Sequence, residues 1–374
     1  MSDLLVRPAV TRRQKQDFLQ FPWTLYRDDP HWIPPLRGNQ MELVGYRPHP
    51  FYEENEAQTF VAYRGGNVCG RVAAIVNRAH IEAFSERRGY FGFFECVDDA
   101  KVAHALFDAA RNWLAERGIE KLRGPANPSI NYEIGTLVEG YDSPPTFMMT
   151  YNADYYPRLI EQCGFRKAQD LYAYHGRADQ LPALEAKRGE LIRKIKEHCN
   201  LTVRPLDKTR FLEDVEAFLE VFNRSLRQTW GALPMTPAEM RYVAKGLRWL
   251  IVPELALGAE IDGRLVGAVF ALPDYNPRIR QIDGRLFPFG VIRLLRRKDR
   301  IKKLRILAAN VLPEYQLLGV GLVLAMGLIP KGVEWGMQEA EFSWVAESNS
   351  LSRGALEKAN ARRIKTYRVY DLDP

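Results

Sequence analysis

The stretch that decides the fold is ILAANVLPEYQLLGVGLVLAMGLIPKG, residues 306–332. An apolar run breaks there at Pro313, passes Gln316, Gly319 and Gly321, and then becomes a long apolar segment. A strand that enters a helix through such a turn directs backbone N–H groups and the positive end of the helix toward one point. The spacing alone leaves two interpretations open: a phosphate held by the backbone, or close packing of a helix on a strand.

The composition is that of an ordinary globular protein with an anionic partner. The chain has 374 residues, a length for which two domains are expected. It is 46% hydrophobic and 26% charged, and its formal net charge is +7. A basic balance favours an anionic partner, which leaves nucleotide phosphates, nucleic acid and an acidic membrane surface open.

Cysteine, histidine and hydropathy patterns exclude several classes. The four cysteines are far apart without a C-x-x-C pair, and the six histidines lack metal-ligand spacing, so we expect a reducing compartment and no metal. The N-terminus has no apolar run of signal-peptide length. The longest apolar stretch, 317–330, is shorter than the ~20 residues that a membrane helix needs. We therefore predict a cytoplasmic protein, with peripheral membrane contact left open.

The chain contains an internal repeat. The tripeptide VRP occurs at residues 6–8 and again at 203–205, an offset of 197. The same offset places FVAYRGGNVCGRVAAIVN over LGAEIDGRLVGAVFALPD, so that Gly70 meets Gly267. In each copy, apolar alternation around a glycine-bearing turn predicts a β-hairpin.

Beyond the hairpins the offset becomes 218, as one insertion between equivalent elements would produce. This offset brings Gly118 onto Gly336 and Asn131 onto Asn349. Chance explains any single match, whereas all of them together favour duplication. Each half then consists of a strand, helices, a hairpin, a strand, a tight loop, a long helix, a strand, a helix and a final strand, which predicts a mixed α/β sheet with helices on its faces.

The turn at 311–321 carries a resemblance to a known family. Its pattern V-x-P-x-x-Q-x-x-G-x-G, between a strand and a helix, resembles the acyl-CoA pyrophosphate loop of the GNAT acyltransferase superfamily. The hairpin at 259–274 and the stretch WVAESNSLSRGALEKANARRIKTYRVY, 344–370, are similar to the same fold. The resemblance covers the second half well and the first half more faintly. It implies an α/β fold of two tandem GNAT-like domains, each a mixed, mostly antiparallel sheet flanked by helices.

The resemblance and the repeat together predict a domain organisation and a co-substrate. We expect a degenerate, acceptor-side domain at 1–180, a helical linker at 181–202 and an acyl-CoA-binding domain at 203–374. The co-substrate is acyl-CoA, a thioester of coenzyme A. Its implied contacts are the turn, the end of the strand before it and one later asparagine: Asn310, Val311, Gln316, Leu317, Leu318, Gly319, Val320, Gly321 and Asn349.

The first half differs from the second at the corresponding turn. At offset 218, Asp98 and Lys101 stand where the second half has Gln316 and Gly319. The carboxylates of Asp98 and Asp99 would repel phosphate. Asp99 or its neighbour is also a good helix N-cap, which would occupy the free N–H groups. We therefore predict that only the second domain binds coenzyme A and that the first shapes the acceptor pocket.

Acyl transfer to an amine needs a proton acceptor, donors for the oxyanion and a proton for the departing thiolate. In the family a carboxylate serves as the base, and Glu347 is the first candidate here, with Glu341 second. Leu356 stands where the family's proton-donating tyrosine is expected, so Tyr367 or Tyr370 would have to substitute. The alternatives are salt-bridged or solvated glutamates and tyrosines that pack in a strand.

Residues 123–159 crowd polar side chains among prolines and glycines. Such a series lines a pocket or forms a structural loop with Asn-capped turns. The candidate acceptor-binding residues are in this stretch and at two tryptophans: Asn127, Asn131, Glu133, Tyr151, Asn152, Trp230 and Trp344. These segments resemble long bacterial GNAT-like proteins with two domains, some of whose relatives are associated with ceramide formation. That resemblance implies an N-acyltransferase acting on a long-chain (sphingoid) amine.

The stretch RLLRRKDRIKKLR, residues 293–305, has eight cationic side chains and one aspartate. It fits an anionic membrane surface, the 3′-phosphate of coenzyme A, RNA, or a solvated loop. Three rivals to the sphingoid interpretation stay open: an acetyltransferase for a small amine or protein lysine, a non-catalytic acyl-CoA sensor, and an RNA-binding protein. We expect acyl-CoA, an amine acceptor and an anionic membrane as partners, and no nucleic acid.

Overall fold

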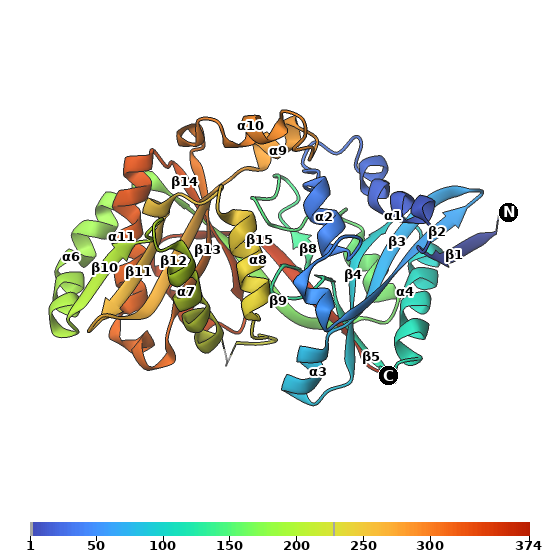
Figure 1. Ribbon diagram of the computed structural model, residues 1–374, viewed down its shortest axis with the longest axis horizontal. Coiled ribbons are helices and arrows are strands. Elements are labelled where there is room, and N and C mark those ends of the chain that lie inside the picture. The colour runs from blue at the N-terminus through green and yellow to red at the C-terminus, as the bar shows by residue number, and fades with distance from the viewer. Residues whose placement is uncertain (1–2, 227–228) are drawn as a thin grey trace. The chain divides into compact units, whose positions relative to one another are not determined.

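The structure is a computed structural model that describes residues 3–226 and 229–374, without the side chains of 181–187. Figure 1 shows its helices and strands. In this described part of the chain, no helix combines the length and the apolar composition that crossing a membrane requires. Nor do three His, Cys, Asp or Glu side chains come together there in a group that could hold a metal ion.

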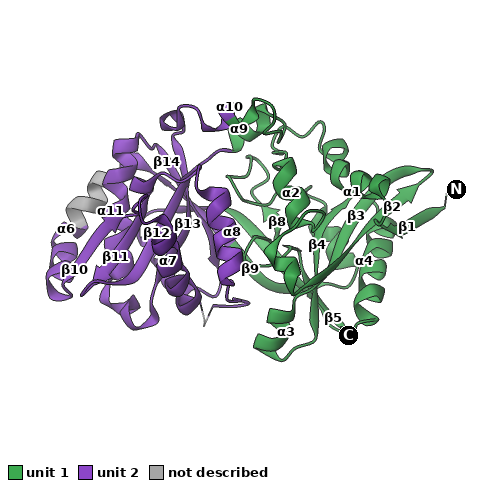
Figure 2. Ribbon diagram, viewed as in Figure 1, with its two compact units in different colours: residues 1–171, 276–291, 365–374 green, residues 172–275, 292–364 purple. Residues whose placement is uncertain are grey.

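The chain divides into two compact units, which Figure 2 colours separately. Unit 1 consists of residues 1–171, 276–291 and 365–374, and unit 2 consists of residues 172–275 and 292–364. The stretch expected as a linker forms α6 (Leu181–His198) and the beginning of β10 (Leu201–Pro205), both in unit 2.

Unit 1 is built on a mostly antiparallel sheet. Its strands follow the order β1-β2-β3-β4-β5-β15; β4 and β5 pair in parallel, the other pairs are antiparallel, and β8 also pairs with β15. Its elements are β1 (Leu4–Pro8), α1 (Arg12–Leu25), α2 (Arg37–Leu43), η1 (Pro50–Glu53), β2 (Glu56–Arg64), β3 (Asn67–Val76), α3 (Arg78–Phe84), β4 (Arg88–Cys96), α4 (Ala100–Ala115), β5 (Lys121–Gly124), β6 (Ala126–Asn127), β7 (Glu133–Ile134), β8 (Thr136–Glu139), α5 (Tyr156–Gln162), the first half of β9 (Arg166–Arg177) and the end of β15 (Arg362–Leu372).

Unit 2 repeats this plan. Its strands follow the order β14-β13-β12-β11-β10, in which only β13 and β14 pair in parallel. Besides α6 and β10, its elements are η2 (Ala178–Gln180), α7 (Phe211–Ser225), α8 (Pro237–Leu247), η3 (Pro253–Leu255), β11 (Ala256–Ile261), β12 (Arg264–Pro273), η4 (Lys298–Arg300), β13 (Lys303–Val311), η5 (Pro313–Leu318), α11 (Val320–Trp335), β14 (Glu339–Ala346) and α12 (Ser350–Lys358).

The two units share the register of their first strands. Val6 pairs with Ala62 in unit 1, and the residues 197 positions later, Val203 and Ala259, pair in unit 2. Each hairpin also has a register shift directly after the repeated alanine. The mixed α/β fold with two tandem copies is therefore confirmed down to single residue pairs.

The long helix of each unit lies close to the sheet at a strand glycine. A Cβ atom at Gly70 would lie 2.7 Å from Leu106 Cδ1 of α4, and one at Gly267 would lie 3.0 Å from Leu324 Cδ1 of α11. Both leucines are fully or almost fully buried. Because protein interiors are close-packed, a larger residue at either glycine would push the helix away. Close helix packing therefore explains one glycine in each copy, outside the turn at 311–321.

An insertion between β12 and β13 contributes to unit 1 instead of unit 2. It contains α9 (Asn276–Gln281) and the start of α10 (Gly290–Leu295). Arg37 donates its backbone N–H to Gly284 O at 3.0 Å, and its guanidinium contacts Asp283 at 2.6 Å. We call residues 276–291 the strap.

Candidate functional site

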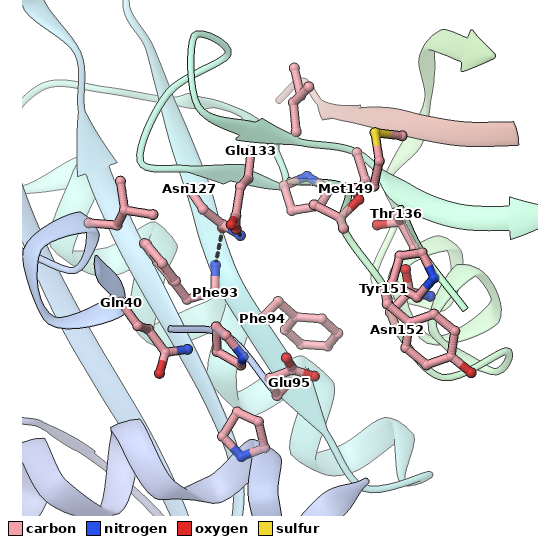
Figure 3. Close-up of a pocket in the computed structure, with 18 of the residues that line it drawn as sticks. Gln40, Phe93, Phe94, Glu95, Asn127, Glu133, Thr136, Met149, Tyr151 and Asn152 are labelled. Carbon is pink, nitrogen blue, oxygen red and sulfur yellow. Dashed lines mark hydrogen bonds between the residues drawn. The ribbon is translucent and has the colours of Figure 1, made fainter. Parts of the chain in front are cut away.

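A cavity of about 130 Å³ lies in unit 1, beside the C-terminal half of β4 (Figure 3). This volume is in the range that accommodates a small organic group. Its walls combine aromatic, aliphatic and proline side chains with amides and hydroxyls. The charged residues that line it are Arg71, Glu95 and Glu133.

A bulge in β4 shapes one wall of this cavity. The pairing of β3 with β4 shifts register between Arg71 and Ala73, and Phe93 adopts a positive φ of 50°. The Phe93 backbone N–H donates to Asn127 Oδ1 at 2.6 Å, which holds the bulge in place. Bulges re-aim side chains, and this one brings Phe93, Phe94 and Glu95 to the cavity.

The bulge depends on a close approach that only glycine permits. A Cβ atom at Gly92 would lie 2.0 Å from the carbonyl oxygen of Ala126. We expect Gly92→Ala to destabilise the fold by about 3 kcal/mol, because the backbone of the cavity wall must move. Urea unfolding measures this. Gly189→Ala is the control, since its Cβ meets nothing within 4 Å and alanine favours a helix. An equal loss in both variants would contradict the packing argument.

Glu95 is held by hydroxyl donors and a buried arginine. The hydroxyls of Tyr26 and Tyr156 donate to Glu95 Oε2 at 2.5 and 2.7 Å, and Arg71 Nη2 lies 3.5 Å from Oε1. Arg71 is 3% exposed and also donates to Phe18 O at 2.8 Å. Burial raises the pKa of Glu95, and the charge of Arg71 opposes that shift.

Glu133 faces the same cavity from β7. Asn127 Nδ2 donates to Glu133 Oε2 at 3.0 Å, and Figure 3 shows these two side chains together at the cavity. Burial raises the pKa of Glu133, while the hydrogen bond from Asn127 lowers it. When both carboxyls are ionised, the negative charges of Glu95 and Glu133 and the positive charge of Arg71 give the cavity a net charge of −1. Such a site favours a cation.

The structure brings together some of the residues expected to bind the acceptor. Asn127, Glu133, Tyr151 and Asn152 all line the cavity. Asn152 also bridges the backbone of Leu137, accepting from its N–H at 2.6 Å and donating to its oxygen at 3.1 Å. The pocket interpretation and the structural-loop interpretation therefore both apply to this stretch.

Other residues from that expectation lie elsewhere. Asn131 lies in the turn that precedes β7, and its backbone N–H donates to Ser129 Oγ there. It is not among the residues that line the cavity. Trp230 and Trp344 belong to unit 2. Arg71 and Glu95 were not anticipated. A usable signal was present, since Glu95 is a charged residue in the aromatic strand YFGFFEC.

The turn predicted to bind phosphate lies in unit 2. β13 ends at Val311, η5 follows, and Gly319 has a φ of 81° before α11 begins. Gln316 Nε2 donates to Val311 O at 3.1 Å across the turn. Among the residues that the structure describes, no side chain caps the N-terminus of α11. Because the first N–H groups of a helix need an acceptor, this end can take an anion.

The strand before the turn also offers a polar group. Asn310 donates to Ser225 Oγ at 2.8 Å, while its buried Oδ1 has no hydrogen-bond partner among the described residues. A buried acceptor without a partner is costly. It therefore fits a ligand N–H, as an amide-bearing pantetheine arm would supply.

The corresponding helix end in unit 1 is closed to an anion. Asp99 caps α4 by accepting the N–H of Lys101 at 2.8 Å. Asp99 also pairs with Arg64 at 2.8 Å, and Asp98 pairs with Arg158. Both carboxylates therefore lie at this helix end, and the expectation that unit 1 does not bind coenzyme A stays a prediction.

The candidate catalytic residues lie in different surroundings. Glu341 has no exposed surface; it accepts from Ser343 Oγ at 2.9 Å and lies 3.6 Å from Lys303 Nζ. Glu347 is partly exposed just after β14. Asn349 caps α12 by accepting the Ser352 N–H at 3.0 Å. Tyr367 belongs to unit 1 and has no exposed surface.

Comparison with known proteins places this fold in a family. No protein-family model matches the chain. The chain is 34% identical over 381 residues to the protein named bacterial ceramide synthase of Caulobacter vibrioides, covering 99% of this chain and 97% of that protein. It is 33% identical over 376 residues to Protein YghO of Escherichia coli, covering 98% and 95%.

Solved structures show the same architecture. A tandem GNAT protein from the clavulanic acid biosynthesis pathway matches with a TM-score of 0.57 at 12% identity, over 99% of this chain and 98% of that chain. A GCN5-related N-acetyltransferase from Sphaerobacter thermophilus matches with a TM-score of 0.54 at 14% identity, over 99% and 95%. The chain therefore has the tandem GNAT fold, and it belongs to the family of long bacterial proteins that includes Protein YghO and the protein named bacterial ceramide synthase.

Proposed function

We propose that the protein is an acyl-CoA-dependent N-acyltransferase whose acceptor is a long-chain amine of the sphingoid type. The observation that carries this proposal is the cavity of unit 1, whose charged residues favour a cation and whose other walls are apolar or hydroxyl- and amide-bearing. An amino alcohol with a hydrocarbon chain has the matching chemistry. The name of the Caulobacter relative supports the same class of acceptor.

Unit 2 supplies the acyl-CoA site in this proposal. The turn from Gln316 to Gly321 would hold the pyrophosphate through backbone N–H groups, and Asn310 Oδ1 would accept from the pantetheine arm. Leu317 and Leu318 are exposed at the turn, so their backbone, not their side chains, carries the contact. Asn349 keeps its side-chain NH₂ group for a ligand while its oxygen caps α12.

Unit 1 supplies the acceptor chemistry. The amine arrives protonated and must lose a proton before its lone pair attacks the thioester carbon. Glu133 is our choice of proton acceptor, because it faces the cavity and because burial raises its pKa above that of a solvated glutamate, which makes it a stronger base. The C–N bond forms, the C–S bond breaks, and a second proton from the attacking nitrogen passes to the departing sulfur, so that coenzyme A leaves as the free thiol.

Other residues rank below Glu133 for this role. Glu347 remains the candidate base within unit 2, because part of its side chain is exposed after β14. The buried pairing of Glu341 with Lys303 and Ser343 suits a structural ion pair. The hydroxyl of Tyr367 has no exposed surface from which to protonate a thiolate, so we assign that side chain to packing.

Free-thiol release tests the proposal. Purified protein is given acyl-CoAs of increasing chain length, with and without a sphingoid base. We expect thiol release that requires both a long-chain acyl-CoA and the sphingoid base. Release with acetyl-CoA and a small amine or a lysine peptide would instead support an acetyltransferase. Tight binding of acyl-CoA without thiol release in the presence of any amine would instead support a non-catalytic acyl-CoA sensor.

The proposal includes a location. A long-chain acceptor resides in a bilayer, and the basic stretch at 293–305 fits its anionic surface. We therefore place the protein in the cytoplasm, at the inner face of the membrane, as a peripheral protein.

A further inference from the structure

The tip of the strap exposes apolar side chains to an unusual degree. Phe287 is 89% exposed, Phe289 is 74% exposed, and Leu286 and Val291 are 37% and 40% exposed. Leu286, Phe287 and Phe289 lie between α9 and α10, and Val291 lies in the first turn of α10. Because both phenylalanine side chains are largely exposed to water, their transfer into an apolar medium is favourable in free energy.

The base of the strap is fastened to the wall of the cavity. Arg280 donates to Pro30 O at 2.6 Å and to Trp32 O at 3.2 Å, and Asn276 donates to Pro145 O at 2.7 Å. Trp32 and Pro145 both line the cavity. The strap is thus anchored on one side to the residues around the cavity and exposed on the other.

Further contacts make this anchoring stiff. Asp283 accepts from Trp23 Nε1 at 2.7 Å and pairs with Arg37. A Cβ atom at Gly284 would lie 2.1 Å from Pro35 O, so the two backbones touch there. Pro35 also lines the cavity. The position of the tip is therefore coupled to the position of the cavity wall.

The charge next to the tip identifies its partner. The chain continues from the exposed apolar residues directly into a basic stretch with one aspartate: Arg293, Arg296, Arg297, Lys298, Arg300, Lys302 and Lys303 with Asp299. Apolar side chains that enter the acyl region beside cations at the headgroup level are the pattern of an interfacial anchor. RNA would use the cations and the rings, but Leu286 and Val291 have no role on a nucleic acid.

We propose that the strap tip, residues 286–291, inserts into an anionic bilayer and holds the cavity wall at that surface, so that a lipid acceptor reaches the cavity from the membrane. Insertion of the tip needs nothing from the proposed acyl transfer, whereas delivery of an acceptor rests on it. One short apolar loop is expected to bind the membrane reversibly, as a peripheral protein does.

Vesicle flotation of the full-length protein tests the insertion. The probes are vesicles of phosphatidylcholine alone and of phosphatidylcholine with phosphatidylglycerol. We expect binding to the anionic vesicles, and at least a tenfold lower partition coefficient for the double variant Phe287→Ser/Phe289→Ser. The matched control is Leu212→Ser/Leu351→Ser, because both leucines are 64% exposed and lie outside the strap. Arg296→Ala/Arg297→Ala should flatten the salt dependence of binding.

Several results would overturn the insertion. One is anionic-vesicle binding that the phenylalanine variant retains in full. Another is the absence of vesicle binding, with salt-dependent binding of a single-stranded RNA that the arginine variant weakens. A third is concentration-dependent self-association in sedimentation velocity that disappears in the phenylalanine variant, which would make the tip a contact between two copies. Thermal unfolding of each variant checks that the exposed substitutions leave the fold intact.

Turnover separates this inference from the proposed function. With a detergent-solubilised sphingoid base, the phenylalanine variant should keep its kcat within twofold, whereas with the base in anionic vesicles it should lose at least tenfold. If the protein binds vesicles but never releases thiol, the proposed acyltransferase function is wrong and the proposed membrane insertion is supported. Full turnover on vesicle-borne base by the phenylalanine variant would defeat the delivery step.

Discussion

Gly321→Asp is expected to lower the affinity for coenzyme A at least a hundredfold while leaving the fold intact. Within 4 Å, the neighbour that a Cβ atom at Gly321 would meet among the described residues is Val311 Cγ2, at an ordinary contact distance of 3.7 Å, so the backbone can accept the side chain. The added carboxylate would lie at the start of α11, where the proposed pyrophosphate accepts N–H groups. Like charges about 4 Å apart in a partly screened site repel by about 4 kcal/mol, which exceeds the 2.7 kcal/mol of a hundredfold change.

Isothermal titration calorimetry with coenzyme A measures this loss, and two variants frame it. Lys101→Asp, at the corresponding helix end of unit 1, should leave the affinity unchanged because Asp99 already closes that end. Gly319→Asp should also abolish binding, but its Cβ would lie 2.7 Å from Ile195 Cδ1, so some loss of stability is expected as well. Equal losses at Gly321 and Lys101 would show that both units bind the cofactor.

Glu133→Gln is expected to lower kcat/KM by 10²- to 10⁴-fold, the usual contribution of a general base. The amide keeps the shape and can still contact Asn127, but it cannot accept a proton. The change also removes one negative charge from the cavity, so KM for a cationic acceptor should rise.

The pH profile distinguishes a base from a merely structural glutamate. Burial raises the pKa of Glu133, and its proton-accepting form accumulates as pH rises through that value, so wild-type kcat/KM should rise with pH there. The groups that act on it from neighbouring elements are Asn127, which donates a hydrogen bond, and the charges of Arg71 and Glu95. Glu133→Gln should flatten that rising limb.

Glu347→Gln is the matched control for the pH experiment. If unit 1 supplies the base, this variant should keep both the rate and the pH profile of the wild type. A flat profile in Glu347→Gln with an unchanged one in Glu133→Gln would move the base to unit 2.

Local patterns in the sequence predicted the features that local physics controls. The hairpin registers follow from apolar alternation and turn glycines, and they recur residue by residue at Val6 and Val203. The Asp99 cap was predictable because a cap involves neighbours in the chain. The polar residues of the cavity, such as Asn127, were recognisable among prolines and glycines.

Other features depend on contacts between distant residues and gave no comparable signal. Glu95 contacts Arg71 and Tyr26, which are distant in the sequence and are brought near it by the fold. The change of offset from 197 to 218 indicated an insertion, but not that it packs on unit 1. The exposed phenylalanines of the strap stood in an apolar stretch that in sequence looks like any core segment.

The make-up of unit 1 has a consequence for how this gene can be divided. A fragment ending at residue 202 would encode neither the strap nor the end of β15. It would lose Asp371, which pairs with Arg123 at 2.7 Å and with Arg88 at 3.3 Å. Unit 1 therefore depends on two segments that are encoded after the start of the second copy, so a single cut in the gene cannot separate the two units.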